Sequence, residues 1–245
     1  MADGCAKRVA GVDGCRAGWV VVSKPIGSPQ STAVSVFSRF ADILAHTPRF
    51  DIIAVDMPIG LPDRIGRDGR GAEKAARKHL GQRQSSVFAV PSRAAVYEED
   101  YRESCRVAQE TSDPPRKVSK QCYYLFPKIR EIDALMTPDL EDRVYEVHPE
   151  LAFWRLNGEA HMSLPKKVKS RANGPGLDQR GDLLTACGLD AAFLNQSLPR
   201  GAGRDDFLDA AANCLIAERI LQGKAEAFPQ DYTRDGKGLR MAIWA

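Results

Sequence analysis

The sequence predicts an α/β fold built on a mixed β-sheet whose first three strands are antiparallel. Three apolar segments closed by turn residues come first along the chain, and the link between the first two is too short for a parallel crossover. A segment with helical spacing then leads into a fourth, almost continuously apolar segment, which is typical of a central strand buried on both faces. This order predicts a meander followed by a right-handed crossover.

Four strands and one helix are expected in this part of the chain. Ser38 is the expected N-cap of the helix. Each strand is bounded by Gly, Pro or Ser residues, which punctuate secondary structure. We expect strands at 8–14, 18–23, 32–37 and 50–60, and a helix at 38–47.

The pattern weakens between residues 61 and 142, where several prolines interrupt it. We expect a basic, helical insertion there, with a helix at 120–135 that breaks at Pro127. Beyond the insertion the regular pattern returns. The expected elements are a strand at 143–150, helices at 150–158, 177–188 and 204–223, and a short last strand at 241–244.

The composition is that of one globular domain. A chain of 245 residues with 43% hydrophobic residues can bury a sizeable core, so we expect a single domain over residues 1–245. The net charge of +3 permits a nucleic-acid partner without requiring one. Because no apolar run spans a membrane, the N-terminus lacks a signal-peptide pattern and the six cysteines are scattered, we expect a cytoplasmic protein with reduced thiols.

Five acidic residues lie at the ends of expected strands or at the start of the last helix. Asp13 lies within or at the end of the first strand, Asp56 ends the fourth, and Glu146 lies in the fifth. Asp206 and Asp209 are three residues apart and therefore share one face of the last helix. These residues are candidates for a common site.

Each of these residues also has a structural explanation. An Asp-Gly pair, as at Asp13, often forms a turn, and an acidic residue at a helix start stabilises the helix, with Asp205 as a natural N-cap. Two features favour a common site instead. The strands around Asp13 and Asp56 are apolar, so unpaired carboxylates there are costly. Asp209 lies on the apolar stripe of its helix that should pack on the sheet.

Several carboxylates at one end of a sheet supply the hard oxygen ligands that Mg²⁺ and Mn²⁺ prefer. Two such ions about 4 Å apart can activate water and stabilise the leaving oxygen in phosphodiester cleavage. We therefore expect a site for two Mg²⁺ or Mn²⁺ ions. The expected ligands are Asp13, Asp56, Asp206 and Asp209, and Glu146 is a further catalytic candidate.

Several blocks of the sequence resemble one known family. They are GVDGCRAGWVVV, VDMPIGLP, QSSVFAVPSR, YEVHPELAFW, KKVKSRANGPGLDQR and DDFLDAAANCLIAE, and they follow the family's order across nearly the whole chain. The family is the bacterial group of predicted ribonuclease H-like nucleases known as domain of unknown function 429. The resemblance implies a ribonuclease H-like fold, a five-stranded mixed sheet with helices on both faces, in agreement with the order expected from the residues alone.

The last helix also resembles the final catalytic helix of Holliday-junction resolvases through its D-x-x-D-A sequence, which starts at Asp206. That resemblance implies that Asp13 is the central metal bridge and Asp56 the ligand from the second acidic strand. Asp206 and Asp209 would be the ligands from the helix. Glu146 has no counterpart in the resolvase pattern and belongs to the family's own EVHPE block.

Basic residues are concentrated at 64–83 and at 166–171. They are suited to the phosphates of a nucleic-acid backbone, although a solvated helix face would explain them equally well. Few aromatic residues are interleaved with these charges, so no base-stacking platform is expected. The residues assigned to the backbone of DNA or RNA are Arg16, Arg70, Arg77, Arg83, Lys166 and Lys167.

The leading functional hypothesis is a metal-dependent nuclease that hydrolyses DNA or RNA. A second is a non-catalytic binding or scaffold protein, which a salt bridge from Arg16 or a lysine filling the acidic cluster would favour. A third is an ATP-handling protein of the actin and sugar-kinase type, because the Asp13 turn resembles their phosphate hairpin. This third hypothesis requires a homodimer, since such proteins place two core domains around the nucleotide.

Overall fold

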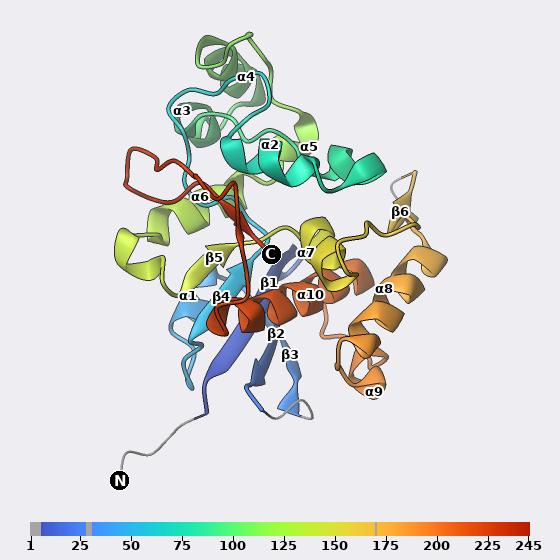
Figure 1. Cartoon of the computed structure of the whole chain (residues 1–245). Coiled ribbons are helices and arrows are strands. Elements are labelled where there is room, and N and C mark those ends of the chain that lie inside the picture. The colour runs from blue at the N-terminus through green and yellow to red at the C-terminus, as the bar shows by residue number, and fades with distance from the viewer. Residues whose placement is uncertain (1–5, 28–30, 170) are drawn as a thin grey trace. The chain divides into compact units, whose positions relative to one another are not determined.

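The computed structural model divides into two compact units (Figure 1). The structure describes residues 6–27, 31–169 and 171–245. The first unit consists of residues 1–56, 143–225 and Ala245, and the second of residues 57–142 and 226–244. The second unit thus contains the expected insertion at 61–142 together with a C-terminal segment that the sequence pattern did not assign to it.

A five-stranded mixed sheet forms the centre of the first unit (Figure 1). Its strands are β1 (Arg8–Cys15), β2 (Gly18–Pro25), β3 (Ala33–Phe37), β4 (Ile52–Val55) and β5 (Val144–Glu146). They lie in the order β3-β2-β1-β4-β5. The first three pair antiparallel, whereas β4 pairs parallel with both β1 and β5. The predicted mixed sheet with an antiparallel start is confirmed.

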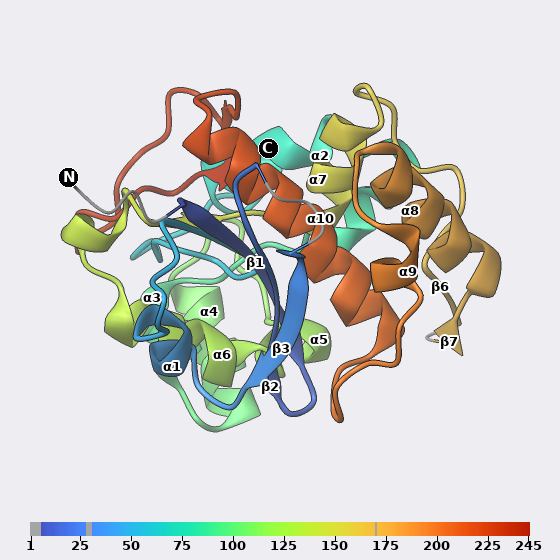
Figure 2. The same cartoon turned by 90° about the horizontal axis from the view of Figure 1, so that it is seen from below.

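The first unit contains one long helix near the end of the chain and several shorter helices. They are α1 (Phe40–Leu44), α7 (Pro149–Leu156), α8 (Gly174–Ala186), α9 (Ala191–Leu194) and α10 (Arg204–Leu221), and a hairpin of β6 (Lys167–Val168) and β7 (Arg171–Ala172) precedes α8. Helix α10 packs on β1, β2 and β4, and α7 and α8 lie beside it (Figure 2). Residues 207–217 of α10 are buried on every side.

Gly11 in the middle of β1 allows α10 to lie directly on the sheet. A Cβ atom at this position would lie 2.0 Å from the backbone nitrogen of Cys214 and 2.2 Å from the carbonyl oxygen of Ala210. Asn213 adds a hydrogen bond from Nδ2 to the carbonyl oxygen of Val12, at 3.1 Å. Backbone packs on backbone here, which fixes the position of α10 along β1.

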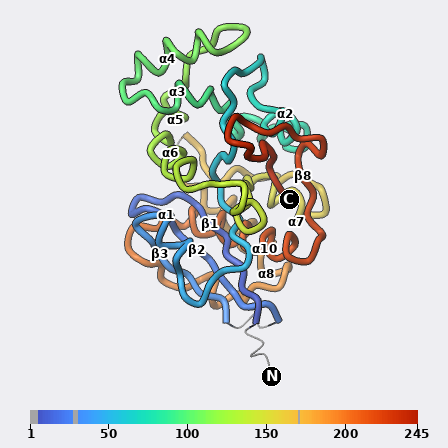
Figure 3. The backbone as a smooth tube through the Cα atoms, turned by 90° about the vertical axis from the view of Figure 1, so that its left-hand side faces the viewer, coloured from blue at the N-terminus to red at the C-terminus, as the bar shows by residue number. Residues whose placement is uncertain are grey.

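The second unit is mainly helical. Its elements are α2 (Gly71–Arg77), η2 (Gly81–Ser86), α3 (Arg93–Tyr97), α4 (Tyr101–Glu110), α5 (Lys120–Tyr123), α6 (Phe126–Leu135), η3 (Pro138–Leu140), β8 (Ala227–Phe228) and β9 (Ile243–Trp244). The strands β8 and β9 pair antiparallel and lie beside α2 (Figure 3).

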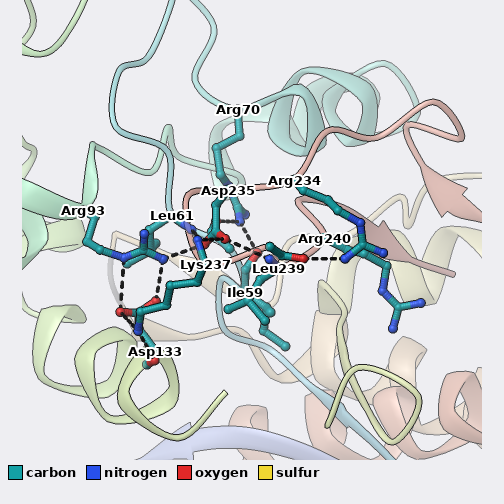
Figure 4. Close-up of polar contacts among 12 residues, drawn as sticks. Ile59, Leu61, Arg70, Arg93, Asp133, Arg234, Asp235, Lys237, Leu239 and Arg240 are labelled. Carbon is teal, nitrogen blue, oxygen red and sulfur yellow. Dashed lines mark hydrogen bonds and ion pairs between the residues drawn. The ribbon is translucent and has the colours of Figure 1, made fainter. Parts of the chain in front are cut away.

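A network of ion pairs holds the C-terminal segment within the second unit (Figure 4). Arg93 bonds to Asp133 at 3.0 Å and to Asp235 at 2.5 Å, and Lys237 bonds to Asp133 at 2.8 Å. Asp235 also accepts the backbone N–H groups of Leu61 and Leu239, each at 2.9 Å. The carboxylates of this network are thus matched by cations and backbone donors.

Two local expectations need correction. The N-cap of α1 is Arg39 and not Ser38. The helix begins at Phe40, whereas a helix capped by Ser38 would begin at residue 39. The helix expected at 120–135 does break, but before Pro127, which lies in the first turn of α6. A proline is tolerated there because the first N–H groups of a helix have no intrahelical partner.

Two further predictions concern the cysteines and membrane-spanning helices. Of the six cysteines, Cys5 lies outside the described residues, and the other five form no disulfide bond among the residues that the structure describes. In the described ranges, no helix has both the length and the apolar character that crossing a bilayer requires.

Candidate active site

Asp13 and Asp56 lie next to each other at the point where the parallel pairing of β1 with β4 ends. Val12 is paired with Val55 in the register of β1 and β4, and the backbone N–H of Asp56 donates to the carbonyl oxygen of Val12 at 3.0 Å. Side chains alternate along a strand, so Asp13 points to the same face as Gly11. That is the face on which α10 packs.

Asp209 reaches this face from α10. The residue is only 3% exposed, and its Oδ2 atom forms an ion pair with Nζ of Lys166. The other oxygen, Oδ1, is buried and accepts no hydrogen bond from any group in the described part of the chain. Gly11 makes this placement possible, because the contact between Gly11 and Ala210 brings the neighbouring Asp209 to the sheet.

The three aspartates are difficult to ionise together. Burial raises the pKa of Asp13 well above its ordinary value, and the charges of Asp56 and Asp209 raise it further. Burial also raises the pKa of Asp56 to about 7, although the Lys166 charge acts in the opposite direction. The pKa of Asp209 rises to about 6, again mainly through burial and against the effect of Lys166. The cluster carries more negative charge than its surroundings compensate.

Lys166 is the cation of this cluster. Its side chain is 24% exposed, compared with 50% for the neighbouring Lys167. Burial lowers the pKa of Lys166, but the charges of Asp209, Glu150 and Asp13 outweigh burial and raise it above its ordinary value. Sequence reasoning assigned Lys166 to the nucleic-acid backbone; the ammonium group instead pairs with a carboxylate inside the protein.

Glu146 belongs to a different face of the sheet. It is paired with Val55 in the register of β4 and β5, so alternation directs it away from the face that carries Asp13 and Asp56. It is buried, and its charge contributes to the raised pKa of Asp56. Of the five acidic candidates, Glu146 is therefore the one that the sheet separates from the face on which α10 packs.

Asp206 and Asp205 lie at the start of α10, at the edge of the cluster. The Oδ2 atom of Asp206 accepts the backbone N–H of Gly203 at 3.1 Å. Burial and the charge of Asp205 raise the pKa of Asp206. Asp205 is not the expected N-cap, since Gly203 occupies that position and Asp205 pairs with Lys167 at 2.6 Å. These two aspartates already have partners.

The ion pair of Glu150 and Arg180 was missed by sequence reasoning. Arg180 is fully buried and donates two hydrogen bonds from one nitrogen to Glu150, at 2.7 and 3.0 Å. It also donates to the carbonyl oxygens of Leu164 and Gly176, at 3.0 and 2.9 Å. A signal was present in the sequence, because Arg180 lies on the same helical stripe as the apolar residue Leu177.

The remaining basic candidates differ in accessibility. Arg16 is exposed in the turn between β1 and β2. Arg70 is a correction: its buried guanidinium pairs with Glu73 at 2.6 Å and donates to two backbone carbonyls, so it is not accessible to a phosphate. Arg77 is half-buried and donates to the carbonyl oxygens of residues 68 and 87. Arg83 is half-buried as well.

The cluster has the donor set that a hard divalent cation requires. Within the described ranges, no group of three or more carboxylate, imidazole or thiol side chains is already spaced to hold a metal ion. Asp13, Asp56 and Asp209 nevertheless supply carboxylate oxygens on one face, and one Asp209 oxygen is buried and unbonded. A cation would relieve the repulsion that raises their pKa values. The residues therefore fit such an ion.

One comparison with known proteins matches most of the chain. A family profile described as "Protein of unknown function (DUF429)" matches residues 11–234, a range that contains every carboxylate of the cluster. Searches of curated proteins and of solved structures give no match. Since the family profile covers most of the chain, from the first strand to the C-terminal segment, the protein belongs to the DUF429 family.

Proposed function

We propose that the protein is a metal-dependent nuclease of the ribonuclease H-like type, which hydrolyses phosphodiester bonds in DNA or RNA. The cluster of buried Asp13 and Asp209 with half-buried Asp56 carries the proposal, because one Asp209 oxygen has no hydrogen-bond partner in the described chain and all three pKa values are raised. Buried carboxylates without sufficient compensation are typical of cation sites. The mixed sheet with its antiparallel start is consistent with the ribonuclease H-like assignment.

The residues around the cluster have distinct roles in this proposal. Asp13, Asp56 and Asp209 would hold Mg²⁺ or Mn²⁺, and Arg16, which is exposed three residues after Asp13, would bind a phosphate of the substrate. When bound, the ion would act as a Lewis acid and lower the pKa of a water molecule. Asp206 lies at the edge of the cluster and raises the pKa of Asp13 through its charge.

A second candidate function is supported by one observation. Lys166 forms an ion pair with Asp209 and places an ammonium charge beside Asp13 and Asp56. A lysine that permanently replaces the metal ion would leave a binding or scaffold protein without catalysis. The two candidates differ in whether the cluster binds a divalent cation at all.

Calorimetric titration of Mn²⁺ into the full chain tests the proposal, followed by cleavage assays on labelled DNA and RNA oligonucleotides in the same buffer. The test variant is Asp13→Asn. The matched control is Asp178→Asn, since Asp178 is an exposed aspartate of α8 in the same unit. We expect binding and Mn²⁺-dependent cleavage in the wild type and in the control, and a loss of both in Asp13→Asn.

The alternative makes the opposite prediction for the same experiment. Absence of Mn²⁺ binding in the folded wild type, with and without oligonucleotide, would reject the nuclease and favour the scaffold function. Cleavage that persists in Asp13→Asn would reject this cluster as the site.

A further inference from the structure

Lys166 comes from the segment that leads into the hairpin of β6 and β7, and it points to the carboxylates rather than to solvent. Its Nζ atom contacts Oδ2 of Asp209, and its charge acts on Asp13 and Asp56 as well. Lys167, the next residue, pairs with Asp205 at 2.6 Å and is twice as exposed, at 50% compared with 24%. Two consecutive lysines therefore engage α10 differently, one within the cluster and one at its edge.

The partners of the surrounding carboxylates determine how much charge remains. Glu150 is neutralised by Arg180, and Asp205 by Lys167. Asp206 keeps its negative charge at the edge of the cluster, where Oδ2 accepts the backbone N–H of Gly203, and the strand register directs Glu146 to the other face of the sheet. The carboxylates that share the face beneath α10 are Asp13, Asp56 and Asp209.

The charge balance of this face favours one divalent ion. Three ionised aspartates carry a charge of −3, and the Lys166 ammonium reduces this to −2. One divalent cation would neutralise these four groups, and Lys166 already occupies Oδ2 of Asp209, an oxygen that a second ion would need as a ligand. The buried Oδ1 of Asp209, which has no hydrogen-bond partner among the described residues, offers a ligand atom that Lys166 does not occupy.

We propose that the cluster binds a single divalent cation through Asp13, Asp56 and Oδ1 of Asp209, and that the Lys166 ammonium takes the place of the second cation expected from the sequence. This inference rests on the proposed metal-dependent function of the same residues. Lys166 then provides a fixed positive charge beside the reacting phosphate, in a position where a second ion would otherwise be bound.

The test is the number of Mn²⁺ ions bound per chain, measured by calorimetry on the full-length protein. The variants are Lys166→Met, which removes the charge, Lys166→Arg, which keeps it, and Lys167→Met as the matched control. We expect one Mn²⁺ in the wild type, in Lys166→Arg and in Lys167→Met. In Lys166→Met we expect two ions, with the first bound at least about tenfold more tightly because a competing charge is gone.

The spectrum of bound Mn²⁺ gives a second measurement that does not depend on the variant folding. Electron paramagnetic resonance of the wild type saturated with Mn²⁺ should show a mononuclear centre without coupling between two ions. A coupled pair in the wild type would overturn the inference and leave the proposed nuclease intact. An unchanged stoichiometry and affinity in folded Lys166→Met would do the same. Absence of Mn²⁺ binding in every form would overturn both proposals together.

Discussion

Asp133 in the second unit and Asp209 in the first are buried to the same degree, each with 3% exposure, but their surroundings differ. Asp133 receives hydrogen bonds from Arg93, Lys237 and Tyr97. Burial alone would raise its pKa, and these donors lower the pKa below the ordinary value instead. Asp209 has one lysine and one unbonded oxygen in the described chain, and burial raises its pKa to about 6.

This difference separates two uses of a buried carboxylate. A carboxylate that is fully matched by cations and donors fixes the chain, as Asp133 and Asp235 fix the C-terminal segment of the second unit (Figure 4). A carboxylate that is incompletely matched costs folding energy, and such a cost is typical of functional sites. Burial alone therefore does not identify a site, whereas burial combined with incomplete compensation does.

The largest expected effect comes from breaking the matched network. Asp133→Ala removes the carboxylate that Arg93 and Lys237 share, and hydrogen bonds to a charged group contribute about 1.5–3 kcal/mol. Urea unfolding should show this loss in the free energy of unfolding. A change below about 1 kcal/mol would mean that the network is not what holds the segment.

A second effect concerns the pH dependence of the metal-free protein. The pKa values of Asp56, about 7, and Asp209, about 6, lie above the value of about 4 in an unfolded chain, so the folded state binds more protons between these limits. The free energy of unfolding should therefore fall as pH rises from about 4 to about 7. Thermal unfolding in chelator at several pH values measures it; a rise over this window would contradict the incomplete compensation.

A third effect has the opposite sign from the first. Asp56→Asn removes one negative charge from the unmatched cluster, and we expect it to stabilise the metal-free protein by about 1 kcal/mol at pH 7. The same variant should flatten the pH dependence described above. Chemical unfolding in chelator tests both points, and destabilisation by Asp56→Asn would place Asp56 with the structural carboxylates.

The smallest effect is expected at the edge of the cluster. The pair of Lys167 and Asp205 is half exposed on the lysine side, and exposed ion pairs contribute about 0.2–1 kcal/mol. Lys167→Ala should therefore change the free energy of unfolding by less than about 1 kcal/mol, and less still at high salt. A loss comparable to that of Asp133→Ala would show that this pair is structural.

The sheet could be predicted because its information is local. Apolar runs, turn residues and short links specify β1 to β4 in order, and the position of Asp56 directly after a strand follows from the same pattern, whereas Asp13 lies two residues before the end of β1. The helical position of Asp209 on a buried stripe was also accessible from periodicity. These features require only a few neighbouring residues to be recognised.

The contacts that decide the charge of the site could not be predicted in this way. Lys166 and Asp209 are 43 residues apart, and their pairing depends on how the segment before β6 returns to α10. The pairing of Arg180 with Glu150 likewise joins residues 30 positions apart. Gly11 gave no signal of its own, because a glycine within a strand does not indicate which helix will pack on it.

The packing of α10 on Gly11 has a consequence for the synthesis of the protein. Val12 and Asn213, which bond to each other at this contact, are 201 residues apart, so the ribosome makes one half of the site long before the other. A nascent or prematurely ended chain that lacks α10 contains Asp13 and Asp56 but not Asp209, and its set of ligands is incomplete. Translation itself thus delays the proposed activity until the last long helix has been made.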